Sequence, residues 1–207
     1  MARAESPETF RERVTTHSMM TIVGVLWTLV VLMVALALTT RGKQITIGWW
    51  AVFPVGWVLV QYSPLTSHHR RAIMLGATLL GSALFIVGTW MAWPRYSRGF
   101  QVVVETVVVE RGFQPFDLLL IATTLAGTFS TIIYRKATIA PWIVLATGLF
   151  LFVITVELGR VLGGGLWVLN WGFNITLGGT VGLVYAGLLG LSSLDAAGKK
   201  PFNGILE

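Results

Sequence analysis

The residues best suited to chemistry lie in an apolar stretch beyond the middle of the chain. Asp117, Thr124, Thr128 and Thr131 follow one another at intervals of seven, four and three residues, which places them on one helix face. Hydroxyl groups below an acid could line a path for protons or small ions, because ionisable groups within membrane spans usually face an interior or a cavity. The structural alternative is that Asp117 favours the helix dipole and that buried threonines bond to the carbonyl one turn earlier.

A second polar set lies nearer the C-terminus. Glu157 and Arg160 are three residues apart and can pair on one helix face. Such a pair is either a structural clasp at a membrane surface, where arginine readily extends toward the headgroups, or a carboxylate that titrates during transport. In the second interpretation Asn170 and Asn174, one helical turn apart, would complete a polar pocket near the same surface.

Three histidines are the only residues that prompt a metal hypothesis. His17, His68 and His69 all fall at the ends of apolar runs. Adjacent histidines point in different directions and chelate poorly by themselves. We therefore expect polar residues in a headgroup-level turn, and the alternative is a surface metal site that His68 and His69 form with His17.

Catalytic signatures are missing from the sequence. It has no G-x-S-x-G, H-E-x-x-H, P-loop or dinucleotide-binding pattern. Cysteine is absent, which excludes disulfides, thiolate metal sites and cysteine nucleophiles. An enzyme is the third of our functional hypotheses, and it would need a cofactor brought by another chain.

Small residues at intervals of four mark the last apolar segment. They are Gly178, Gly182, Ala186 and Gly190. This spacing puts them on one helix face and lets another helix backbone approach closely, which is how helices associate in lipid. We expect this stripe to pack on other chains, either other subunits or a second copy.

The elements that carry these residues are apolar runs of membrane-spanning length. The chain is 55% hydrophobic and 12% charged, whereas a soluble domain carries about 25% charge. Its net charge of +6 comes from basic residues scattered at the ends of the runs, which argues against a nucleic-acid partner and for lipid headgroups. Bound lipid is the only cofactor that we expect.

The sequence predicts an all-α integral membrane protein with a bundle of about six transmembrane helices. A cytoplasmic segment, 1–18, that forms a short interfacial helix or a solvated tail precedes a membrane domain over 19–192, and a cytoplasmic tail follows over 193–207. Pro54 should kink the second span. The predicted spans are 19–38, 45–62, 72–93, 116–134, 141–159 and 166–191.

An even number of spans puts both termini on one side, and the distribution of lysine and arginine places that side in the cytoplasm. The one longer connection, 94–115, then lies outside. Its β-branched core over 101–110 predicts a strand-like or interfacial segment.

These observations lead to two main functional hypotheses. The first is a non-catalytic accessory or structural subunit of a larger membrane complex, with membrane lipids and other subunits or further copies as partners. The alternative is a small transporter or channel that moves protons, ions or a small solute through a polar path on the fourth to sixth spans.

Overall fold

The computed structural model describes residues 7–40, 50, 52–63, 65–90, 94–96, 115–135, 137–162, 167–169 and 171–196. Within these residues the fold is helical, with one short two-stranded ribbon. In chain order the elements are α1 (Pro7–Thr40), α2 (Val52–Tyr62), α3 (Ser67–Trp90), β1 (Pro94–Tyr96), α5 (Pro115–Ile133), α6 (Ala140–Leu162), β2 (Trp167–Leu169) and α7 (Trp171–Ala196).

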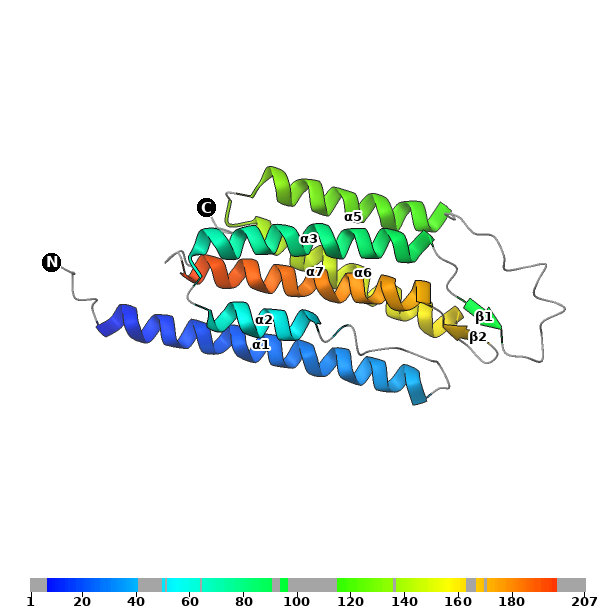
Figure 1. The fold of residues 1–207 in the computed structure, drawn as a ribbon, viewed down its shortest axis with the longest axis horizontal. Helices are drawn as coiled ribbons and strands as arrows, with labels where there is room; N and C mark the ends of the chain where they lie inside the picture. The colour runs from blue at the N-terminus through cyan, green and yellow to red at the C-terminus, as the bar shows by residue number, and fades with distance from the viewer. Residues whose placement is uncertain are drawn as a thin grey trace.

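The described helices lie side by side, and successive helices run in opposite directions (Figure 1). Helix α7 lies in the middle of the bundle, where it packs most closely on α3 and α6 and also contacts α1 and α2. Helix α5 packs on α3 and α6. The first residue of α1 and the last of α7 are at the same end of the bundle (Figure 1).

Proline occupies the first turn of four of these helices. Pro7 and Pro115 are the first residues of α1 and α5, and Pro141 is the second residue of α6. A first-turn residue needs no backbone N–H, so the fixed φ of proline favours helix initiation there. Pro54 is the third residue of α2 and not the middle of a long span, so the predicted kink is replaced by a helix start.

Three helical segments among the described residues are long and apolar enough to cross a membrane. They are Ser67–Trp90, Ala140–Glu157 and Gly172–Leu194. Three shorter apolar segments accompany them, Met20–Val34, Val52–Tyr62 and Leu118–Ile133. By length and composition, the described part of the chain thus contains three helices that could span a membrane.

Two expected boundaries differ from the structure. Helix α1 runs unbroken from Pro7 to Thr40, so residues 7–18 belong to the same helix as the first predicted span, since no glycine or proline lies between Glu8 and Met19. Residues 167–169, expected to begin the last span, form β2 and pair with β1 antiparallel, with Arg95 opposite Val168. The predicted strand at 101–110 lies outside the described residues, as do 1–6, 45–49 and 197–207.

The ribbon follows from the packing of its neighbours. Helices α3 and α7 are antiparallel neighbours, so the end of α3 and the start of α7 are adjacent. The chain leaving α3 and the chain entering α7 therefore meet in opposite directions and can exchange backbone hydrogen bonds.

Two hydrophobic clusters surround α7. One joins it to α1 and α2 and includes Trp27, Trp57 and Tyr185. The other joins it to α3, α5 and α6 and includes Phe85 and Leu151. Polar groups on the helix faces that form these clusters therefore lie inside the bundle.

Candidate functional site

The threonines proposed as a polar path are buried along α5. Thr124 and Thr131 are fully buried and Thr128 is 7% exposed. Each hydroxyl donates to a carbonyl one turn earlier: Thr124 to Leu120 at 2.8 Å, Thr128 to Thr124 at 2.8 Å and Thr131 to Gly127 at 2.7 Å. The helix itself therefore satisfies these groups, as the structural alternative predicted. The side chain of Asp117 lies outside those described.

One of these hydroxyls also bridges two helices. Thr128 and Ser82 of α3 lie 2.7 Å apart through their hydroxyl oxygens, and both residues are buried. Most other buried hydroxyls behave like those of α5, since Thr78, Thr89 and Thr176 donate to carbonyls of their own helices. The interior of the bundle thus contains many hydroxyl groups that are already hydrogen-bonded.

The second polar set is only partly described. Asn174 is 3% exposed near the start of α7, whereas Glu157 is exposed near the end of α6. The side chain of Arg160 and the whole of Asn170 lie outside the described residues, so neither the ion pair nor the polar pocket is tested. Thr155, two residues before Glu157, was not predicted as part of the site. It is fully buried, and its hydroxyl has no partner among the described residues.

His68 and His69 lie in the first turn of α3, and His69 contributes to the start of that helix. Thr66 precedes α3, and its hydroxyl oxygen accepts the backbone N–H of His69 at 3.5 Å while lying 2.7 Å from His69 Nδ1. This is the N-cap arrangement, in which a side-chain oxygen satisfies a free N–H of the first turn. The ring planes of His68 and His69 lie at 88° to each other. No cluster of three metal-binding side chains occurs among the residues described. His17 has no described side chain.

A buried arginine beside these histidines was missed by the sequence analysis. Arg70 is 9% exposed and donates to three carbonyls that end α2 or follow it: Nη2 to Gln61 at 3.3 Å and to Ser63 at 3.1 Å, and Nε to Leu65 at 3.3 Å. The last carbonyls of a helix have no partner within it, so a cation there is favourable. Arg70 is thus a cap for α2 and ties that helix to the start of α3.

The small-residue stripe of α7 lies inside the bundle. A β-carbon added at Gly182 would contact the ring of Phe53 in α2, and one added at Gly190 would contact Met74 and Pro141. Ala186 is fully buried, and Gly178 is buried as well. The stripe therefore packs on helices of the same chain, because α7 is covered on all sides.

Two further glycines of α7 make the closest backbone approaches. A β-carbon at Gly179 would stand 2.6 Å from the backbone nitrogen of Phe85, and one at Gly187 would stand 2.8 Å from Cα of Leu145. These residues lie off the predicted stripe. The sequence pattern thus captured some of the small residues that pack α7 in the bundle and missed those at the close backbone contacts with α3 and α6.

An aromatic group joins α1, α2 and α7. The ring of Trp57 covers Gly24 of α1, and its centroid lies 6.2 Å from that of Tyr185. The hydroxyl of Tyr185 is 2.6 Å from that of Thr28, which also donates to the carbonyl of Gly24 at 2.8 Å. This hydroxyl pair connects the first helix to the central one.

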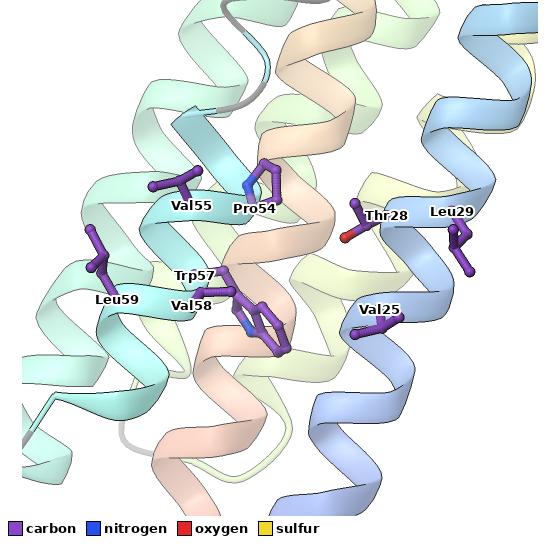
Figure 2. Close-up of a pocket in the computed structure, with 8 residues that line it drawn as sticks. All are labelled: Val25, Thr28, Leu29, Pro54, Val55, Trp57, Val58 and Leu59. Atoms are coloured by element: carbon purple, nitrogen blue, oxygen red, sulfur yellow. The ribbon is translucent and has the colours of Figure 1, made fainter.

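A groove of about 390 Å³ opens beside this group, between α1 and α2. In Figure 2 Trp57 and Val58 extend from α2 toward α1, while Val25 and Thr28 lie on the side of α1 that faces α2. Its lining residues are Val25, Thr28, Leu29, Pro54, Val55, Trp57, Val58 and Leu59. The sequence carried no signal for this groove, since its two walls are apolar segments indistinguishable from their neighbours.

Comparison of the chain with protein-family models, with curated proteins and with solved structures finds no match.

Proposed function

We propose that the protein is a multi-pass membrane protein with six membrane-crossing helices, and that it is a non-catalytic accessory or structural subunit of a larger membrane complex. Three helical segments have the length and hydropathy of membrane spans. The remaining three are apolar and lie alongside them in alternating directions (Figure 1). A membrane that contains the first three helices would therefore contain the three shorter ones as well.

Charge supports a cytoplasmic position for both termini. Arg70 and Arg71 are in the first turns of α3, and Arg135 follows the end of α5. The start of α3 and the end of α5 lie at the same end of the bundle as the start of α1 and the end of α7 (Figure 1). An excess of arginine and lysine in short connections favours the cytoplasmic side.

The observation that carries the subunit proposal is an exposed small-residue face on α3. Ala72, Gly76 and Ala83 are exposed on one helix face, together with Leu79 between the last two. A β-carbon added at Gly76 would have no atom within 4 Å. Because membrane helices associate where small residues let their backbones approach, this face fits a helix of another membrane protein.

The bundle interior supports the same proposal. Its buried threonines other than Thr155 are hydrogen-bonded to their own helices, and its glycines place α7 against the backbones of α3 and α6. An interior of this kind holds helices together, and these hydrogen-bonded hydroxyl groups need neither a solute nor a chain of water molecules.

The test is to purify the tagged protein from its native membrane in a mild detergent and identify the chains that co-elute in stoichiometric amounts. Gly76→Leu should remove a partner without reducing the yield of folded protein. Gly56→Leu is the matched control, since a β-carbon there also has no atom within 4 Å but lies on α2. A stable, lipid-stripped monomer without partners would overturn the proposal.

One observation favours the alternative of a small transporter or channel. The unpartnered hydroxyl of Thr155 lies two residues from Glu157, and an unsatisfied buried polar group costs about 1–3 kcal/mol. That cost is tolerable if water or a solute reaches it. In this alternative Glu157→Gln abolishes flux of protons or small ions in liposomes while the protein still folds. Flux that is absent in the unaltered protein excludes the alternative.

A further inference from the structure

The groove between α1 and α2 is apolar throughout. Most of its lining side chains are aliphatic, and five of them are at least 43% exposed: Val25, Leu29, Val55, Val58 and Leu59. Thr28 carries the one hydroxyl in the lining, and that group already contacts the Gly24 carbonyl and the Tyr185 hydroxyl. A polar ligand would lose its hydration here without gaining new partners, so the groove fits a hydrocarbon.

The depth of the groove is given by the packing of α1. Met20 packs on Leu191 and Leu194, near the end of α7. Val25 and Leu29 lie five and nine residues further along α1, which corresponds to about 7.5 and 13.5 Å of helix. Since the hydrocarbon core of a bilayer is about 30 Å thick, the groove lies at the level of the acyl chains of one leaflet.

The composition of the walls distinguishes an acyl chain from a partner helix. Membrane helices dock closely where small residues let their backbones approach, as the glycines of α7 do. The exposed walls of the groove are valine and leucine instead. Such branched walls fit a flexible hydrocarbon chain.

We propose that this groove binds one acyl chain of a membrane phospholipid, and that the bound chain helps to hold α1 on the bundle. Helices α1 and α2 both pack on α7 but make little close backbone contact with each other. An acyl chain in the groove contacts both walls (Figure 2). The inference depends on membrane insertion but not on the subunit role.

The test uses phosphatidylcholine vesicles that contain a small fraction of phosphatidylcholine with a diazirine midway along one acyl chain. After illumination, adducts on the reconstituted full chain are mapped by mass spectrometry. Adducts should concentrate on the peptides that contain Val25 to Leu29 and Val55 to Leu59. Unlabelled lipid should compete for this labelling in a saturable manner.

Two pairs of variants make the test specific. Val25→Trp and Val58→Trp fill the groove and should each reduce adducts on both walls by about tenfold, the equivalent of about 1.4 kcal/mol of binding. Val30→Trp and Val52→Trp change exposed valines on the same helices outside the groove, and should retain the labelling. Elution profiles establish that each variant is folded. If one groove variant does not fold, the other still tests the proposal.

Three outcomes would overturn the proposal. Adducts spread evenly over the exposed faces of α1 and α5 indicate bulk lipid only. Equal labelling of Val25→Trp and Val30→Trp means that the groove is not the site. In native membranes, a photoreactive amino acid in place of Val25 that attaches to protein would identify a partner helix or a second copy as the occupant. Groove variants that lose lipid labelling but still co-purify with partner chains would show that this inference and the subunit proposal can be tested separately.

Discussion

Helices α7 and α1 are held in the same bundle by different means. From Gly172 to Leu194 every residue of α7 is buried except Ile175, which is partly buried. In α1 only four described positions are buried, Met20, Gly24, Trp27 and Val31, and they form a single narrow seam. Both helices are apolar, so their hydropathy does not account for the difference.

The two helices differ in the atoms that their glycines contact. Glycines of α7 meet the backbones of α3 and α6, where an added carbon would require whole helices to move. Gly24 of α1 instead faces the outer edge of the Trp57 ring, so an added carbon there would displace a side chain and not a backbone. In a bilayer, where packing drives helix association, the first kind of contact makes a rigid centre and the second a yielding edge. Four predictions test this difference, from the largest expected effect to the smallest.

The largest effect is expected at the centre. Gly179→Leu places a side chain against the Phe85 nitrogen and the Gly81 carbonyl and should destabilise the protein by about 3 kcal/mol. Thermal unfolding in detergent measures it. Gly76→Leu, at an open position on α3, meets no neighbouring atom and should stabilise the protein by up to about 1 kcal/mol, because leucine favours a helix over glycine. Equal melting temperatures for the two variants would refute a rigid centre.

A smaller effect is expected where α2 is tied to α3. Arg70→Met removes three hydrogen bonds to carbonyls at the end of α2 and should cost about 2 kcal/mol. Amide exchange should rise in the last turn of α2 and remain low in α7. Arg71→Met, at the neighbouring, less buried position, is the control. Unchanged exchange in α2 would show that the cap contributes nothing.

The edge should yield more easily than the centre. Gly24→Leu crowds the Trp57 ring, but leucine favours a helix over glycine by about 1 kcal/mol, which offsets part of the strain. We expect a net loss of about 1 kcal/mol. Faster amide exchange confined to α1 and α2 would support a local change, whereas a loss as large as that of Gly179→Leu would remove the distinction between the two helices.

The smallest effect concerns the hydroxyl pair of Thr28 and Tyr185. A double-mutant cycle of Thr28→Val and Tyr185→Phe should give a coupling of about 0.6 kcal/mol, a usual value between membrane helices. The matched cycle is Ser82→Ala with Thr128→Val, a hydroxyl pair between α3 and α5. Both cycles should agree in size, and a coupling near zero for the first would mean that packing alone holds α1.

Parts of the candidate site were readable from the sequence. The spacing of Thr124, Thr128 and Thr131 predicted a common face, and the alternative that they bond to their own helix matches the hydrogen bonds observed. Glu157, Arg160, Asn170 and Asp117 stay predictions. The role of Arg70 was missed because its carbonyl partners become neighbours only when the turn after α2 folds back on α3.

Most of the fold was predictable for a local reason. A run of about 20 apolar residues and a proline in the first turn depend only on neighbouring positions, so each of the six predicted segments overlaps one helix of the structure and ends or begins near one of its ends. The second was the least accurate, since α2 begins at Val52 and residues 45–49 lie outside the description. The pairing of β1 with β2 joins segments far apart in sequence and had no local signal.

The sequence by itself determined that this is a helical chain with segments apolar enough to span a membrane, and where most of its helices lie. Only the tertiary structure decided that α7 is central, that its glycines face helices of the same chain, and that α1 and α2 enclose a groove. The physical reason is that lipid tails are as apolar as leucine. Hydropathy therefore marks a membrane helix without marking its buried face, and the partner of each face is settled by which backbones and side chains fit together.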